Sequence, residues 1–217
     1  MSKLVIAIDG PAGSGKSTVA KRVARELGLS YLDTGAMYRA VALKAFRAGF
    51  GPNDGDAVGA LAERTHIGFG PGDPQKVFLD GEEVTSLIRT SEIGELASAL
   101  SAHTPVRRAL VARQRELIAQ GGVTLEGRDT TTVVAPNADL KVFMTASVDV
   151  RARRRTDELL QKGLPADLDA IRAAIEERDH RDSTRADSPL KIADDAVVIE
   201  TDHLTVEEVV RLVLSYL

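Results

Sequence analysis

The sequence predicts an α/β fold with a mostly parallel central sheet, and three observations carry this prediction. Short runs of apolar and β-branched residues recur at residues 4–8, 123–125, 140–144 and 196–199, as in strands buried on both faces of a parallel sheet. Segments with helical periodicity separate these runs. A glycine-rich turn follows the first run directly. Strands that alternate with helices form βαβ units, and such units build a parallel sheet.

Two of the intervening helices are marked by their ends. One is predicted to open with Thr104 as N-cap and Pro105 in its first turn, and to stop at the glycine pair 121–122. The last helix is predicted to start at a capping box formed by Thr205 and Glu208. These signals set helix boundaries independently of hydrophobic periodicity.

One stretch breaks the alternation of strands and helices. From about residue 49 to residue 90, glycine, proline and aspartate are frequent. Within it, residues 76–79 and 82–84 flank Asp80 and Gly81, a pairing typical of a β-hairpin. We therefore predict a small antiparallel insertion in the α/β core, with no linker that would make it a separate domain.

The composition excludes several classes of protein. The 217 residues include 28 basic and 32 acidic side chains, a formal charge of −4, so an anion must be held by a local basic cluster rather than by a generally basic surface. The absence of cysteine excludes disulfides, thiolate zinc sites and thiol catalysis. No run reaches the ~18 apolar residues of a membrane span, and Asp9 interrupts the first run too early for a signal peptide. We expect a cytoplasmic protein that binds neither membranes nor nucleic acid.

The strongest functional signal is the loop after the first strand. It satisfies the pattern G-x-x-x-x-G-K-[ST] between a buried strand and an apolar-periodic helix, the context that this pattern requires. Its glycines let successive backbone N–H groups converge on a phosphate, and the helix adds the positive end of its dipole. Lys16 can reach the β- and γ-phosphates of ATP, and the Ser17 hydroxyl can bind Mg²⁺. A plain glycine turn with an exposed lysine is the weaker alternative. The predicted nucleotide-binding residues are Gly10, Pro11, Ala12, Gly13, Ser14, Gly15, Lys16, Ser17 and Thr18.

Two further segments place glycine beside charged residues at the ends of predicted elements, where α/β sheets bind ligands. The first is residues 33–39, in which Asp33 or Thr34 could equally well cap the helix that follows. The second, residues 126–129, ends a buried strand with two acids and an arginine. That composition favours a functional loop over an ordinary surface turn.

Two charged helical segments are open to two interpretations. In residues 176–185, a helix would align Arg178, Asp182 and Arg185 along one stripe, although a solvated, salt-bridged face would look the same. Residues 151–155 contain four arginines in five positions. Such charges repel one another unless an anion lies among them, so either a phosphate-facing lid or a solvated face explains them.

Taken together, these segments resemble the bacterial cytidylate kinases. The resemblance runs in order from about residue 4 to residue 215. The P-loop alone is shared by many folds, whereas the D-[ST]-G-A-x-Y-R, G-R-D and E-R-D-x-R-D segments are far more specific. The matching segments are residues 10–18, 33–39, 88–90, 106–107, 126–129 and 177–182.

The resemblance implies a P-loop kinase core with a five-stranded parallel sheet flanked by helices, a small monophosphate-binding insertion and a helical lid. It implies one domain, 1–217, with its core at 1–39, 104–146 and 166–217, the insertion at about 40–103 and the lid at about 147–165. The implied reaction is transfer of the γ-phosphoryl group of ATP, with Mg²⁺, to CMP and dCMP. A monomer is expected.

Residue roles follow from the same resemblance, which brings seven arginines to one cleft. The residues implied around the acceptor phosphate are Thr34, Tyr38, Arg39 and Arg128. Those implied to read the cytosine edge are Ser98, Arg107 and Asp129. Asp182 would hold the sugar hydroxyl, flanked by Arg178 and Arg185. Arg151 and Arg155 would close with the lid over the transferring phosphoryl group, and Lys16 would act on the phosphates.

The chain departs from the family pattern at three positions in and after the G-R-D segment. Glu126 stands where aspartate is usual, which moves a carboxylate with a role in Mg²⁺ hydration by one methylene. Thr131 stands where glycine is common, and Ala135 where an aromatic residue is common.

Two other functions are compatible with the P-loop. One is a kinase for another small acceptor, such as UMP, AMP or shikimate. The other is a switch that hydrolyses nucleotide, which would need a water-positioning residue and switch loops. The sequence instead supplies arginines and acids around a second anion.

Overall fold

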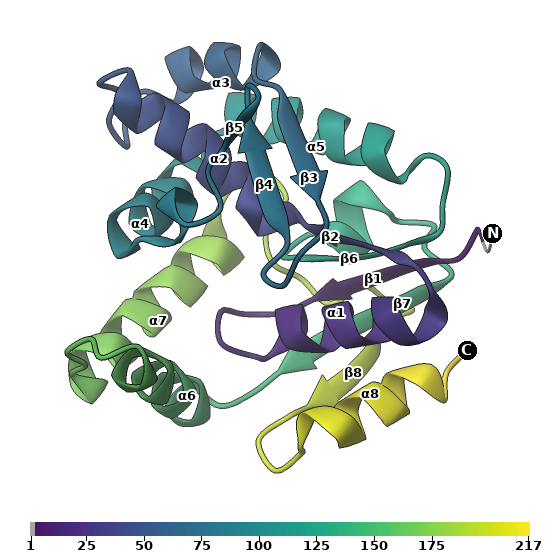
Figure 1. Cartoon of the computed structure of the whole chain (residues 1–217). Helices are drawn as coiled ribbons and strands as arrows, with labels where there is room; N and C mark the ends of the chain where they lie inside the picture. The colour runs from purple at the N-terminus through teal and green to yellow at the C-terminus, as the bar shows by residue number, and fades with distance from the viewer. Residues whose placement is uncertain (1–2) are drawn as a thin grey trace. The chain divides into compact units, whose positions relative to one another are not determined.

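The computed structural model describes residues 3–217, which form two compact units (Figure 1). Unit 1 contains the chain up to Leu32 and from Ile118 to the C-terminus. Unit 2 is the continuous segment Asp33–Leu117.

Unit 1 is built on a five-stranded parallel sheet, which confirms the predicted α/β fold. The strand order is β2-β6-β1-β7-β8, so β1 lies at the centre between β6 and β7. The carboxyl ends of these three strands lie at one edge of the sheet, where ligands bind in α/β folds. The strands are β1 (Val5–Asp9), β2 (Ser30–Asp33), β6 (Val123–Gly127), β7 (Leu140–Thr145) and β8 (Val197–Glu200).

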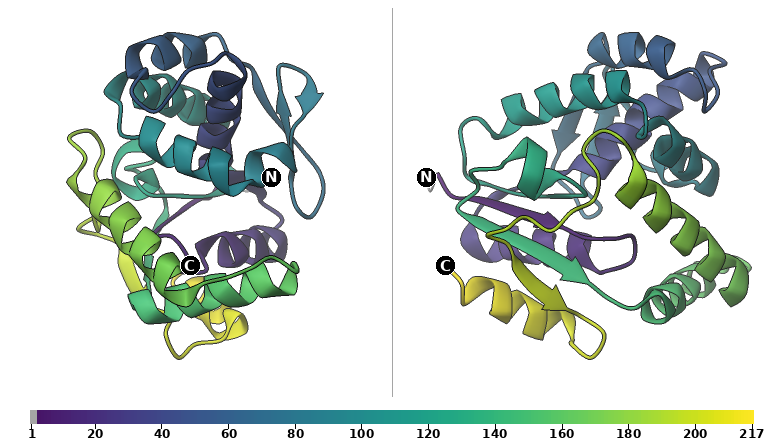
Figure 2. Two further views of the ribbon diagram at one scale, coloured as in Figure 1. Left: turned by 90° about the vertical axis from the view of Figure 1, so that its left-hand side faces the viewer. Right: turned by 180° about the vertical axis from the view of Figure 1, so that it is seen from behind.

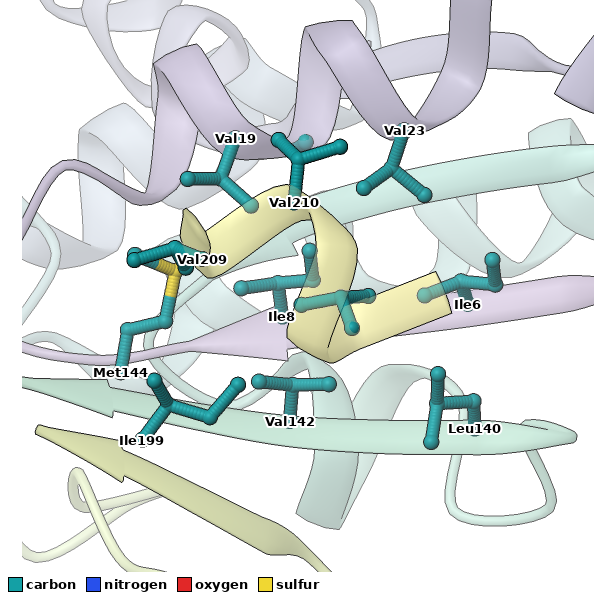
Figure 3. Packing of buried hydrophobic residues seen from close by; sticks show 12 residues of the cluster. Ile6, Ile8, Val19, Val23, Leu140, Val142, Met144, Ile199, Val209 and Val210 are labelled. Atoms are coloured by element: carbon teal, nitrogen blue, oxygen red, sulfur yellow. The ribbon is translucent and has the colours of Figure 1, made fainter. Parts of the chain in front are cut away.

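Helices α1 (Lys16–Leu27) and α8 (Val206–Leu214) cover the sheet with apolar side chains. Figure 3 shows Val19 and Val23 of α1 packed over Ile8 of β1, with Val210 of α8 beside them. The capping box predicted for α8 is confirmed, since its threonine and glutamate bond each other's backbone N–H groups. This packing fixes the start of α1 at the carboxyl end of β1.

Helices α6 (Val148–Gln161) and α7 (Leu168–Thr184) lie side by side in unit 1 (Figure 2). Side-chain caps start both: Ser147 accepts from the backbone of α6, and Asp167 from that of α7. An ion pair between Asp149 and Arg172 joins the two helices. A π-helical turn, η2 (Thr130–Val134), follows β6.

Unit 2 combines helices with a three-stranded antiparallel sheet, β3-β4-β5. Residues of β4 and β5 pair across the turn at 80–81, which confirms the predicted hairpin. The predicted helix near residue 104 is also confirmed, with Thr104 as its first residue. The elements are α2 (Thr34–Arg47), α3 (Gly55–Glu63), β3 (Ile67–Gly70), β4 (Lys76–Leu79), β5 (Glu82–Glu83), η1 (Leu87–Arg89), α4 (Ser91–Leu100) and α5 (Thr104–Ile118). Throughout the described residues, every helix is too short or too polar to cross a membrane.

Candidate active site

The P-loop connects β1 to α1 through glycines in conformations that other residues rarely adopt. Gly10, Gly13 and Gly15 have φ values of 152°, 79° and 87°, in the range that favours glycine. A Cβ atom on Gly10 would lie 2.0 Å from the carbonyl oxygen of Met144, so the loop begins where no side chain fits. Gly15 caps α1 without a side-chain bond. The amide groups of the first helical turn are therefore left for an anion.

Lys16 is buried against its own loop. Its Nζ donates to the carbonyl oxygen of Pro11 at 3.1 Å and lies 4.0 Å from Glu126 Oε2. Burial, together with the charge of Arg128, lowers the pKa of Lys16 to about 7, and Glu126 opposes this shift. The P-loop cation therefore lies in a poorly hydrated place, close to the charged residues that follow β6.

Glu126 brings a carboxylate to the P-loop hydroxyl. Ser17 Oγ donates to Glu126 Oε1 at 2.7 Å, and the Tyr31 hydroxyl donates to the same oxygen at 3.3 Å. The longer side chain at this position thus still reaches Ser17. Hydroxyl and carboxylate oxygens are the ligand atoms that Mg²⁺ prefers. Ser17 and Glu126 therefore fit a magnesium ion that would also bind the phosphates of a nucleotide.

A buried ionic network follows β6. Arg128 Nε donates to Asp182 Oδ2 at 2.9 Å, and Arg185 Nη1 lies 3.4 Å from Asp182 Oδ1. Arg178 Nε lies 3.9 Å from Asp182, and Arg185 Nη2 lies 3.9 Å from Asp129 Oδ1. Burial raises the pKa of Asp182, but the three arginines outweigh it and hold that pKa below its usual value. With Asp182 only 3% exposed, this stripe is not a solvated helix face.

The arginines of α6 lie in different surroundings. Arg151 is buried, donating to the carbonyl oxygens of Ala146 and Ala12 and pairing with Asp179 of α7 at 2.6 Å. Arg155 is exposed and pairs with Glu158 one turn further along the helix. Arg151 therefore ties the P-loop to both helices, whereas Arg155 remains at the surface.

In unit 2, the contacts of the predicted residues form two groups, one around Asp33 and one around Arg107. Asp33 caps α2 by accepting from the backbone N–H of Ala36, and its second oxygen binds Arg39 at 2.9 Å. Of the two candidate caps in this segment, Asp33 is the one that acts. Arg107 is buried, donates to a backbone carbonyl and lies 5.4 Å from the centre of the Tyr38 ring. Thr34 and Ser98 are also buried within unit 2.

Sequence reasoning missed two acidic residues of unit 1. Asp9, the last residue of β1, is completely buried and accepts bonds from Thr130 and Thr131. Asp179 is the partner of Arg151. A lone acid at the end of an otherwise apolar strand was a signal for Asp9. Asp179 lies in the E-R-D-x-R-D segment, but nothing in that segment indicated a contact with Arg151.

Comparison with known proteins places these features in one family. The family model described as cytidylate kinase matches residues 6–217. A cytidylate kinase of Listeria monocytogenes is 48% identical over 213 residues, which cover 98% of this chain and 95% of that protein. A cytidylate kinase of Ligilactobacillus salivarius is also 48% identical and covers 99% of this chain and 96% of its own length. An uncharacterized protein from Eubacterium ventriosum is similar in fold, with a TM-score of 0.54, 13% identity and coverage of 98% and 97%.

Proposed function

The chain belongs to the cytidylate kinase family, and we propose that it transfers the γ-phosphoryl group of ATP to the 5′-phosphate of CMP, and also of dCMP, giving ADP and CDP or dCDP. One observation of unit 1 supports the proposal most directly. The P-loop lysine lies 4.0 Å from Glu126 Oε2 at the end of β6. Two residues further along the chain, Arg128 joins a network of arginines and acids beyond the need of the donor alone. A second anionic substrate explains that excess of arginine.

The residues of this chain act through alignment and charge neutralisation. The acceptor oxygen of a nucleoside monophosphate is already an anion, so no general base is needed. The P-loop amides and Lys16 hold the donor phosphates, and Arg128 balances the charge that spreads over the transferring group. Arg155 approaches that group when the helices close. The resemblance implies the same place for Arg151, but because Arg151 bonds the carbonyl oxygen of Ala12 and pairs with Asp179, we assign it to holding the P-loop in place. Water, which would compete as acceptor, is excluded by this closure.

Magnesium fits the donor set of Ser17 and Glu126. When bound, the ion neutralises and orients the phosphates of ATP. Ser17 Oγ donates to Glu126 Oε1 in this structure, which keeps the hydroxyl oxygen oriented at the start of α1. We assign Ser17 as a magnesium ligand. We assign Glu126 as the residue that orients Ser17 and a water of the ion's hydration shell.

The residues assigned to the acceptor follow the family motifs. Asp129 accepts a hydrogen bond from the exocyclic amine of cytosine, which uracil lacks. The residues assigned to the rest of the base are Ser98 and Arg107. Those assigned to the acceptor phosphate and its surroundings are Thr34, Tyr38, Arg39 and Arg128. Those assigned to the sugar are Asp182, with Arg178 and Arg185 beside it.

Steady-state kinetics with a panel of acceptors tests this function. We expect kcat/KM for CMP to exceed that for UMP by about 100-fold or more, because uracil offers a carbonyl to a buried carboxylate and leaves that acid unpaired. We expect the same preference over AMP and shikimate, which lack the amine, ring nitrogen and carbonyl that cytosine presents together. ATP hydrolysis that no acceptor stimulates would instead identify a switch.

Asp129→Ala tests the base assignment. It should lower kcat/KM for CMP by about 10- to 100-fold, the value of one hydrogen bond to a charged group, and leave the dissociation constant of ATP within about twofold. Asp129→Asn keeps one acceptor oxygen, so its kcat/KM for CMP should lie between the values of the wild type and of Asp129→Ala. Unchanged kinetics with CMP would remove Asp129 from the base site.

We also propose that the protein works in the cytoplasm as a monomer. Light scattering during size-exclusion chromatography tests the oligomeric state.

A further inference from the structure

The last side chain of β1 is a buried carboxylate with no part in the reaction described above. Asp9 is 0% exposed and lies one residue before the P-loop. Its Oδ1 accepts from the backbone N–H of Thr130 at 2.9 Å and from the hydroxyl of Thr130 at 2.7 Å. Its Oδ2 accepts from the backbone N–H and hydroxyl of Thr131, both at 2.7 Å. One carboxylate thus holds two consecutive residues of a distant loop by four bonds.

The loop that Asp9 holds is the one that carries Arg128 and Asp129. Asp9 and Gly127 are register partners at the ends of β1 and β6, so the P-loop and this loop leave the sheet next to each other. The π-helical turn then folds back, with the N–H groups of Val133 and Val134 donating to the carbonyl oxygen of Asp129 at 2.8 and 3.1 Å. The backbone of Asp129 is therefore anchored by its own carbonyl and by the clamp on the two residues that follow.

A carboxylate is a costly way to fill this position. An apolar side chain would pack a buried strand without giving up hydration, whereas an ionised carboxylate must recover its hydration from protein donors. Burial raises the pKa of Asp9, and the four threonine bonds oppose that shift. The Asp9 side chain therefore contributes hydrogen bonds to Thr130 and Thr131 rather than apolar packing.

We propose that Asp9 is a positioning residue for phosphoryl transfer, which through Thr130 and Thr131 fixes Arg128 and Asp129 relative to the P-loop. The inference rests on the proposed function, since it assigns those two residues to the acceptor. Donor and acceptor groups must be held within a fraction of an ångström for transfer. A single carboxylate between the two loops supplies that constraint.

The Thr131 hydroxyl is the part of the clamp that a substitution can remove on its own. A glycine at this position would keep the amide bond to Asp9 Oδ2 and lose the hydroxyl bond. The threonine hydroxyl adds a fourth donor to an otherwise three-donor carboxylate.

Three adjacent threonines provide a matched experiment. Thr131→Val keeps the shape of the side chain and removes the hydroxyl, and Thr131→Ser keeps the hydroxyl. Thr132→Val is the control, because the Thr132 hydroxyl is buried but has no hydrogen-bond partner among residues 3–217. These variants avoid replacing Asp9 itself, whose loss could prevent folding.

We expect Thr131→Val to raise the KM for CMP about 5- to 10-fold and to leave the KM for ATP within about twofold, since the lost bond is the one by which the charged Asp9 holds the loop of the acceptor residues. Thr131→Ser should restore the KM for CMP, and Thr132→Val should resemble the wild type. An unchanged KM for CMP in Thr131→Val would overturn the inference. Equal increases in both KM values, or the same change in Thr132→Val, would show that the Thr131 contact serves only the general stability of the protein. Either result would also overturn the inference.

Hydrogen exchange separates this inference from the proposed function. Amides of residues 130–134 should exchange faster in Thr131→Val than in the wild type or in Thr132→Val, whatever the acceptor is. A wild-type protein that does not phosphorylate CMP would contradict the proposed function while this difference still supports the clamp. Equal exchange in all three proteins would overturn the clamp even if CMP is a good substrate.

Discussion

The first and later turns of α6 carry the same side chain in two opposite environments. At the first turn, next to the P-loop, Arg151 is 3% exposed and bonds two backbone carbonyl oxygens and Asp179. On the later turns, the Arg155 side chain is 43% exposed and pairs with Glu158 on the same helix. An arginine that is buried and bonded on several sides is fixed, whereas one at the surface can move at little cost.

This difference separates two tasks within one arginine cluster. A fixed guanidinium holds the backbone of the P-loop in one place relative to α7. A mobile one can meet a phosphate that arrives later, and it leaves behind only an exposed ion pair of small energy. The cluster therefore combines a buried brace at Arg151 with an exposed cation at Arg155.

Removing the P-loop cation should have the largest effect. Lys16→Met retains an unbranched apolar stem and loses the charge that we propose for the donor phosphates, so we expect kcat to fall about 1,000-fold, or ~4 kcal/mol in the activation barrier. The fold should persist, because the Nζ of Lys16 bonds one carbonyl oxygen of its own loop. Single-turnover kinetics and circular dichroism measure the two quantities. Near wild-type turnover would exclude Lys16 from catalysis.

Separate substitutions of the exposed and the buried arginine of α6 test the comparison directly. Arg155→Ala should lower kcat about 10- to 100-fold with the melting temperature unchanged, since the side chain is exposed and its proposed role is to meet the phosphoryl group on closure. Arg151→Met should reduce the free energy of unfolding by about 2 kcal/mol, less than for a fully buried pair because Asp179 keeps some contact with water. Arg153, also exposed, is the control, and Arg153→Ala should change neither quantity. A loss of stability in Arg155→Ala equal to that of Arg151→Met would contradict the division.

The smallest expected effect is a linkage between ATP binding and protons. Burial and Arg128 lower the pKa of Lys16 to about 7, with Glu126 and Asp182 opposing and Arg178 adding to the shift. Bound phosphates favour the protonated amine, so Mg·ATP should bind with proton uptake, and its affinity should fall about tenfold for each pH unit above 7. The pKa of the lysine in the unfolded chain is near 10.5. Burial of the charged amine therefore lowers the free energy of unfolding by its full amount below pH 7, and this loss of stability is relieved as the pH rises from 7 towards 10.5.

Titration calorimetry in buffers of different ionisation enthalpy measures the proton uptake. Lys16→Met is the control and should show none. Identical heats in all buffers for the wild type would show that Lys16 is already fully protonated before ATP binds.

Local sequence patterns predicted the secondary structure because the responsible forces act over a few residues. The apolar runs, the hairpin turn at 80–81 and the capping box of α8 each depend on neighbours in the chain, and each is present. The burial of Asp182 could not be predicted in this way. It depends on Arg128, 54 residues away in the sequence, and a charged helix reads the same whether it faces water or protein.

The same limit explains the missed residues of the site. Asp9 was visible as a polar end to an apolar strand, but its four donors lie 121 and 122 residues later. Only the register between β1 and β6 shows that these segments meet. The candidate nucleotide-binding residues, by contrast, form one contiguous motif, so the sequence alone could identify them.

The order of segments in unit 1 has a consequence for the synthesis of the protein. The ribosome produces β1 and the P-loop first, but the strands that flank β1 are β6 and β7, which follow only after all of unit 2 has been made. Unit 2 is one continuous segment and can complete its own core while β1 waits unpaired. A nascent chain interrupted before residue 123 therefore carries the whole glycine-rich motif without either of the strands that flank β1 in the sheet.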